Sequence, residues 1–137
     1  MKYAIRWIIT VVLVLSLSLL GSCAIGLAED GLEIHFIDVG QADAALIRCD
    51  GESMLIDGGN VGDSNVIYTY LQKQGVTHLD YIVCTHAHED HVGGFPAVLA
   101  VYPTAAVYAP TKTYSSNVFD DFLYYTDQQR LEVTIPA

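Results

Sequence analysis

The stretch His86-Ala87-His88-Glu89-Asp90-His91 decides how the rest of the chain is interpreted. It follows the apolar run Tyr81-Ile82-Val83-Cys84 and precedes the flexible pair Gly93-Gly94. Three imidazoles and a carboxylate beside an apolar strand are costly to place unless something binds them. A metal ion is the simplest such partner, whereas a solvated, histidine-rich turn is the alternative. Four potential ligands within this stretch, at the end of a predicted strand, favour a metal site.

The spacing of the ligands suggests two ions. Alternate side chains of an extended segment point the same way, so His86 and His88 can bind one ion. The chain then turns after Glu89, and Asp90 and His91 point elsewhere, towards a second ion. Glu89 itself is expected to face solvent. Imidazole and carboxylate ligands suit Zn²⁺ first, with Mn²⁺, Fe²⁺ or nickel as alternatives.

The N-terminus has the pattern of an export signal. Lys2 and Arg6 precede the apolar run Ile8–Leu20, which is shorter than the roughly 20 residues that a spanning helix needs. Leu20-Gly21-Ser22-Cys23 resembles the lipobox of bacterial lipoproteins, which makes Cys23 a candidate for lipidation. Ordinary cleavage before Glu29 and an uncleaved membrane anchor are the alternatives. We therefore expect residues 1–28 to be a leader and residues 29–137 to lie outside the cytoplasm, at the membrane or secreted.

The part that follows the leader is strongly acidic. All 16 acidic residues follow Ala28, and the basic residues there are Arg48, Lys73, Lys112 and Arg130. A cluster of lysines and arginines for gripping phosphate backbones is not apparent. Cys49 and Cys84 lie in predicted strands, where they are either buried thiols or, because export permits it, a disulfide.

Apolar alternation, turn dipeptides and helix caps predict an α/β (α+β) fold with a mixed sheet. The first three strands should be antiparallel neighbours, and the fourth should be central. The glycines of Asp57-Gly58-Gly59 allow Asp57 to be held at the sheet end facing a site, although the residues alone favour the alternative of a turn aspartate that caps backbone amides. We expect strands over Glu33–Val39, Ala44–Cys49, Met54–Ile56, Tyr81–Thr85, Ala105–Tyr108 and Leu131–Ile135, and helices over Ser64–Gln74, Ala97–Val101 and Asn117–Thr126.

The motif His-x-His-x-Asp-His after a buried strand resembles the signature of the metallo-β-lactamase fold hydrolases. The segments Ile34–Ala44 and Leu55–Gly59 bring the resemblance closest to the ComEC-like competence proteins. That family folds as a four-layer αββα sandwich of two similar halves. The resemblance therefore implies that residues 29–137 form the first half, with helices on one face of the sheet, and that the second half is missing from this sequence.

The resemblance also implies roles for the motif. His86 and His88 would bind one ion, Asp90 and His91 the other, and Asp57 would be a supporting carboxylate. Two ions about 3.5 to 4 Å apart acidify a water to a pKa near 7, which implies hydrolysis, with Asp90 orienting the nucleophile. The family takes its remaining ligands from the second half. No histidine follows His91 here, which favours a fragment of a longer protein.

The family connection suggests a phosphodiester or nucleic-acid substrate, although the acidic surface counts against DNA. A hydrolase of a small ester, lactone or lactam is one alternative, and a non-catalytic binding module of a DNA-uptake system is another. The remaining histidines are His35, which is expected to be structural within the first strand, and His78, which is expected in a loop. Neither belongs to the predicted site.

Overall fold

A mixed sheet is the framework of the computed structural model, which describes residues 31–137. Its six strands lie in sequence order across the sheet. The first three are antiparallel neighbours, and the remaining pairings are parallel, which confirms the predicted mixed sheet. The strands are β1 (Glu33–Phe36), β2 (Ala45–Cys49), β3 (Glu52–Ile56), β4 (Leu79–Val83), β5 (Thr104–Tyr108) and β6 (Val133–Thr134).

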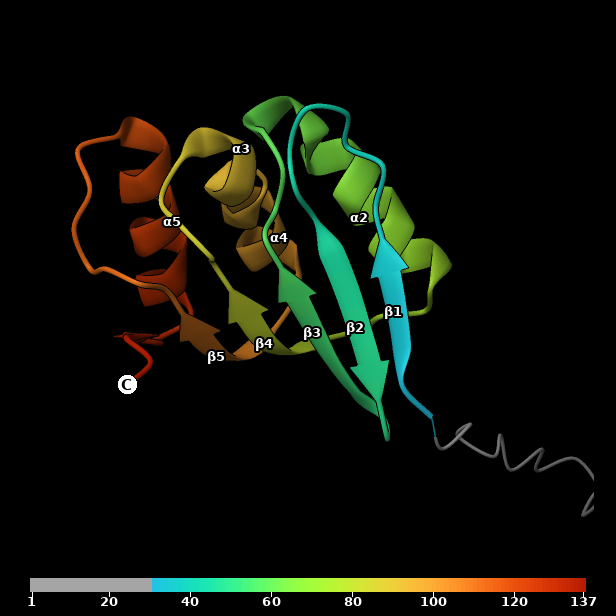
Figure 1. Cartoon of the computed structure of the whole chain (residues 1–137). Helices are drawn as coiled ribbons and strands as arrows, with labels where there is room; N and C mark the ends of the chain where they lie inside the picture. The colour runs from blue at the N-terminus through green and yellow to red at the C-terminus, as the bar shows by residue number, and fades with distance from the viewer. Residues whose placement is uncertain (1–30) are drawn as a thin grey trace, which may run out of the picture.

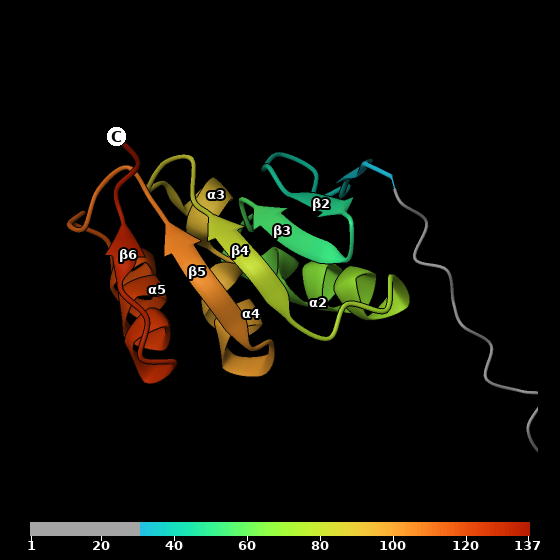
Figure 2. The same ribbon diagram turned by 90° about the horizontal axis from the view of Figure 1, so that it is seen from below.

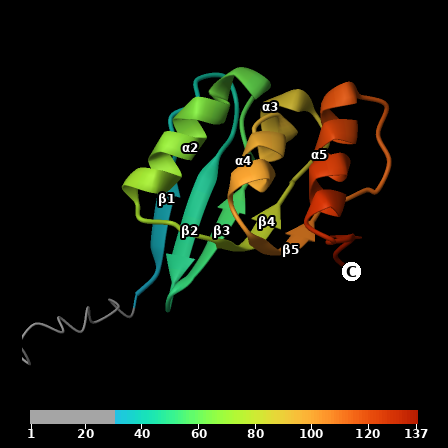
Figure 3. The same ribbon diagram turned by 180° about the vertical axis from the view of Figure 1, so that it is seen from behind.

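The helices cover one face of this sheet, as predicted (Figures 1 and 3). Each parallel connection, from β3 to β4, β4 to β5 and β5 to β6, passes through helices on that face, while the opposite face stays bare in the view from below (Figure 2). The helices are the 3₁₀ turn η1 (Val61–Asp63) and α2 (Ser64–Lys73), α3 (Glu89–Val92), α4 (Phe95–Val101) and α5 (Asn117–Gln128).

The core lies between the sheet and the helices. Leu46, Leu55, Ile82 and Val107 pair across β2 to β5, and each is 0% exposed. Because side chains alternate along a strand, the next residues face the other way, and that face is also largely apolar. Its members are only partly covered or are exposed, and Phe36 is 84% exposed. They are Ile34, Phe36, Ile47, Met54, Ile56, Tyr81, Val83, Ala106 and Tyr108.

Several element boundaries differ from the predictions. β1 ends at Phe36 rather than at Val39. The backbone N–H of Ile37 still donates a hydrogen bond to the carbonyl of Ala44, and the chain then turns away from β2. The fourth strand lies two residues earlier than expected, over Leu79–Val83, and the last strand is only Val133–Thr134. Helices at the predicted positions are confirmed, and Gly75, at φ +71, ends α2.

The predictions for the cysteines are only partly correct. Cys49 and Cys84 are both free thiols, so the disulfide alternative is wrong. Cys84 is buried as expected, but Cys49 is exposed because it ends β2 beside the turn at Asp50-Gly51. The proposed leader, with Cys23, lies outside the described residues. Within residues 31–137, no helix is long and apolar enough to cross a membrane.

Candidate metal centre

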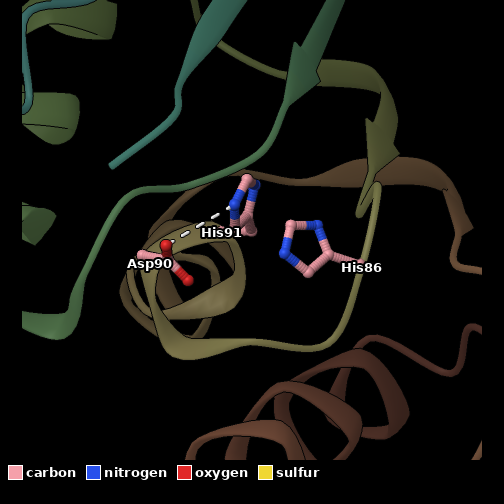
Figure 4. A group of neighbouring side chains, drawn as sticks. All are labelled: His86, Asp90 and His91. Carbon is pink, nitrogen blue, oxygen red and sulfur yellow. Dashed lines mark ion pairs between the residues drawn. The ribbon is translucent and has the colours of Figure 1, made fainter. Parts of the chain in front are cut away.

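A single turn of helix after β4 builds the centre of the site. His88 is extended, at φ −71 and ψ 153, and caps the four-residue helix α3. The turn directs Asp90 and His91 back towards His86, which lies in the loop between β4 and α3 (Figure 4). One ligand atom from each of these three residues lies within 4.8 Å of the others. Three of the four predicted metal ligands are therefore brought together.

The fourth predicted ligand, His88, lies beside this group. Its ring centroid is 4.9 Å from that of His86 and 5.8 Å from that of Tyr114, and its side chain is exposed. The rings of His86 and His91 are much closer, with centroids 3.6 Å apart. The geometry thus groups His86 with Asp90 and His91, whereas the sequence pairs His86 with His88.

Asp57 fixes the orientation of His91. This carboxylate is 3% exposed and accepts three hydrogen bonds, from the Thr85 backbone N–H (2.8 Å), the Thr85 hydroxyl (2.6 Å) and Nδ1 of His91 (2.8 Å). An ionised carboxylate can only accept, so Nδ1 carries the proton and Nε2 keeps its lone pair free. A carboxylate that orients an imidazole in this way is the usual outer partner of a metal-binding histidine.

The glycines hold the site by close packing. The Gly58 N–H donates to the His91 carbonyl (2.6 Å), and the Gly94 N–H donates to the Gly58 carbonyl (3.0 Å). A Cβ on Gly94 would lie 2.2 Å from the Gly58 carbonyl oxygen, and one on Gly93 would lie 2.3 Å from the Val61 nitrogen. Gly93 and Gly94 are buried, so the prediction of a flexible pair is wrong. Only glycine lets the two segments approach this closely.

Cys84 supports the site without joining it. Its thiol donates to the carbonyl oxygen of His86, with Sγ and O 3.0 Å apart. Burial raises the pKa of this thiol to about 12. The group of potential ligand atoms formed by His86, Asp90 and His91 does not include Cys84. Glu89 is exposed, as expected. His35 hydrogen-bonds the Tyr70 hydroxyl, 2.9 Å away, and the exposed His78 lies just before β4, so both are outside the cluster.

The donor set fits a divalent cation. His86 and His91 offer imidazole nitrogens, and Asp90 offers a carboxylate. Because Nδ1 of His91 is hydrogen-bonded to Asp57, Nε2 is the nitrogen of that ring left for an ion. Neutral imidazole with carboxylate is a ligand set used by Zn²⁺ and also by Mn²⁺ and Fe²⁺. The group can therefore hold a metal ion, and its side chains do not distinguish among these metals.

The family model of the Metallo-beta-lactamase superfamily matches residues 37–136. The chain belongs to this superfamily. The predicted recognition and fold class are thereby confirmed, with the helix-covered mixed sheet as its structural counterpart.

Named relatives fall into two groups. Recombination protein 2 of Haemophilus influenzae is 31% identical over 98 residues, which cover 66% of this chain and 12% of that protein. Competence protein ComA of Neisseria gonorrhoeae is 37% identical over 59% of this chain and 12% of that protein. Hydroxyacylglutathione hydrolase of Stenotrophomonas maltophilia is 37% identical over 49% of this chain and 24% of that protein. The chain thus spans about an eighth to a quarter of the length of these relatives.

A solved structure of the metallo-beta-lactamase SMB-1, bound to 2-mercaptoethanesulfonate, is 28% identical to the aligned part of the chain. The alignment covers 55% of this chain and 29% of that structure, with a TM-score of 0.49.

Two residues at the site were missed by sequence reasoning, namely Thr85 and Asp43. The Asp43 carboxylate oxygen Oδ2 lies 3.5 Å from Nε2 of His91. The directions of the strands could have indicated that Asp43 lies near the site. β1 and β3 both run antiparallel to β2, and β4 runs parallel to β3, so the segments after β1, β3 and β4 leave the sheet at one edge. Each of these segments contributes one aspartate to the site. Asp43 follows β1, Asp57 follows β3 and Asp90 follows β4.

Proposed function

We propose that the full-length protein is an exported metal-dependent hydrolase, similar to the ComEC-like competence proteins, that acts on phosphodiester substrates. The observation that carries the proposal is the grouping of His86, Asp90 and His91 within 4.8 Å, with His91 oriented by a buried carboxylate. Such an arrangement has a chemical purpose for an ion and little purpose without one, because it concentrates imidazoles and carboxylates at a sheet end.

Divalent ions bound there would supply Lewis acidity to a water and to an oxygen of the scissile group. The chain's own residues perform the remaining tasks. His86, His91 and Asp90 bind, and His88 adds a further imidazole from its position against the His86 ring. Asp57 keeps the proton of His91 on Nδ1. Asp90 is 47% exposed, so its carboxylate can also face the incoming water and accept its proton.

The choice of a phosphodiester substrate rests on the relatives named for recombination and competence. The excess of acidic residues over basic ones in the described part of the chain disfavours binding of a long nucleic-acid backbone through its phosphates. A substrate that binds through one phosphate at the metal centre therefore suits this chain better than duplex DNA held along the surface. Zn²⁺ is the proposed ion, with Mn²⁺ or Fe²⁺ as alternatives.

A second candidate is a hydrolase of a small ester, lactone or lactam. Several relatives are hydroxyacylglutathione hydrolases, with 34 to 39% identity over parts of this chain. A non-catalytic binding module of a DNA-uptake system is a third candidate. Retention of all four ligands from His86 to His91 favours the enzyme, since a binding module has no need for them.

The largely apolar open face of the sheet supports the proposal that a further part of the domain packs against it. Residues 29–137 are proposed to be the N-terminal part of a metallo-beta-lactamase-like domain whose second half packs on the apolar side chains around Ile47, Met54 and Tyr81. That half would supply the remaining metal ligands. A leader over residues 1–28, cleaved or lipidated at Cys23, would hold the protein at or beyond the outer face of the membrane.

Turnover of bis-p-nitrophenyl phosphate by the zinc-loaded full-length protein tests the proposal. A thioester probe and a lactam probe, measured at the same enzyme concentration, separate the two enzyme candidates. Phosphodiesterase activity that His86→Ala abolishes supports the proposal. Activity on the thioester or lactam alone transfers the assignment to the second candidate, and inactivity on all three probes despite bound zinc supports the binding module.

A further inference from the structure

The two nitrogens of His91 have different surroundings. Nδ1 is committed to Asp57, at 2.8 Å, so Nε2 is the nitrogen that remains for an ion. Two carboxylates flank this Nε2 at similar distances, Asp90 at 3.7 Å and Asp43 at 3.5 Å. Ligand atoms that bind one zinc through bonds of about 2.0 to 2.2 Å in a tetrahedron lie about 3.4 Å apart. Each oxygen therefore lies within about 0.3 Å of the separation from Nε2 that two ligands of one zinc ion show.

The backbone of Asp43 is held by both of the other segments of the site. Its N–H donates to the carbonyl of Asp90 (3.1 Å), and its carbonyl accepts from the N–H of Gly59 (2.9 Å). The position of Asp43 is thus fixed against the metal motif on one side and the Asp57-Gly58-Gly59 loop on the other. These bonds belong to the main chain, so they leave the side chain free for another role.

The side chain of Asp43 has no other evident task. It is 72% exposed, and within residues 31–137 its one side-chain partner is His91. It contacts the cluster through His91 alone, and an exposed carboxylate rotates about its χ bonds at little cost. The backbone of the preceding residue, Ala42, is not left-handed, and the left-handed conformation in this loop falls on Gly40, at φ +67.

We propose that Asp43 is a third protein ligand of the ion that Asp90 and His91 bind. This inference rests on the proposed function, since it assumes that the site binds metal. In the two-ion arrangement that the family resemblance implies, His86 and His88 belong to the other ion, so Asp90 and His91 are the ligands of this ion within the described residues. A carboxylate from Asp43 would bring them to the three protein ligands that a zinc site usually has, before the second half adds its own. Two carboxylates also balance the double charge of the cation. The loop after β1 thereby becomes part of the metal centre.

The test compares Asp43→Asn with Glu89→Gln in the full-length protein. Asn keeps the size of the side chain and both main-chain hydrogen bonds, so the fold should survive, which the far-ultraviolet circular dichroism and Tm of the metal-free protein check. Glu89 is exposed, lies next to Asp90 and takes no part in the site, so its variant controls for the loss of one negative charge. Zinc affinity is measured by competition with a chromophoric chelator, and ligand geometry by the visible spectrum of the Co²⁺-loaded protein.

We expect Asp43→Asn to weaken the affinity for the zinc ion that Asp90 and His91 bind by roughly 10- to 100-fold and to change the Co²⁺ spectrum. The zinc affinity of Glu89→Gln should stay within about twofold of that of the wild type. Equal zinc affinity and equal Co²⁺ spectra for the two variants, in a protein whose wild type binds two ions, would overturn the role of Asp43 and leave the proposed function intact. A wild type that binds less than one ion would instead overturn the proposed function.

Discussion

Replacing Asp57 with asparagine should move a proton on His91 and thereby weaken metal binding. Oδ1 of Asp57 accepts from the Thr85 N–H, and an asparagine oxygen can keep that bond. The amide NH₂ then takes the place of Oδ2, where it donates to the Thr85 hydroxyl and to Nδ1 of His91. His91 can accept that bond only if its own proton moves to Nε2, the nitrogen that faces the ion.

The fold should tolerate this change. Asp57 has a left-handed backbone, at φ 55, which asparagine adopts as readily as aspartate does. The Thr85 backbone N–H keeps its acceptor, but the Thr85 hydroxyl loses Oδ2 as an acceptor and the remaining hydrogen bonds lose their charge. We expect this to cost about 1 to 3 kcal/mol of stability. Loss of an orienting carboxylate usually weakens metal binding on the order of 10- to 100-fold. That is about 1.4 to 2.8 kcal/mol of binding free energy.

Two measurements on the full-length protein test this reasoning. Long-range nitrogen–proton NMR of the metal-free protein reports which nitrogen of His91 carries the proton, and chelator competition reports the Kd for zinc. Asp80→Asn is the matched control, because Asp80 also accepts a backbone N–H, from Ser53 at 2.7 Å, but lies at the opposite end of β4. An unchanged His91 tautomer, or a zinc Kd for Asp57→Asn equal to that of Asp80→Asn, would refute the role of Asp57.

Three further predictions concern packing, thiol reactivity and metal removal. Gly94→Ala should cost about 1 to 3 kcal/mol or more in urea unfolding because its Cβ overlaps backbone, whereas Gly62→Ala, whose Cβ meets nothing within 4 Å, should cost far less. Iodoacetamide should modify the exposed Cys49 and spare Cys84 in native protein at pH 8, as peptide mapping can show, because burial holds the pKa of Cys84 at about 12; equal labelling would contradict this. Free zinc at 100 times Kd should stabilise the protein by about 2.7 kcal/mol, and a chelator or His91→Ala should remove the resulting rise in Tm.

The sheet and the longer helices could be predicted because their signals are local. Apolar alternation marks β2 and β3, and a cap, helical spacing and a closing glycine mark α2 between Ser64 and Gly75. The motif could also be recognised from His86 to His91 alone. Helix α3 was missed because four residues are too few to display a helical period, and the regrouping of His86 with Asp90 and His91 depends on that helix.

Other features depend on contacts between distant segments. The tight packing of Gly94 becomes visible only when Gly58 is placed against it, and glycine alone in a sequence indicates flexibility equally well. Asp43 looks like an ordinary turn residue until the strand order puts the ends of β1, β3 and β4 at one edge. The exposure of Cys49 likewise follows from its place at the end of β2, next to the turn.

The central claim is that side chains gathered after β4 bind divalent cations. Metal content of the purified full-length protein, determined by elemental mass spectrometry after incubation with zinc and desalting, tests it most directly. The account predicts about two zinc ions per chain, with at least one lost in His86→Ala. Less than one ion per chain in the wild type, with no change in His86→Ala, would contradict it.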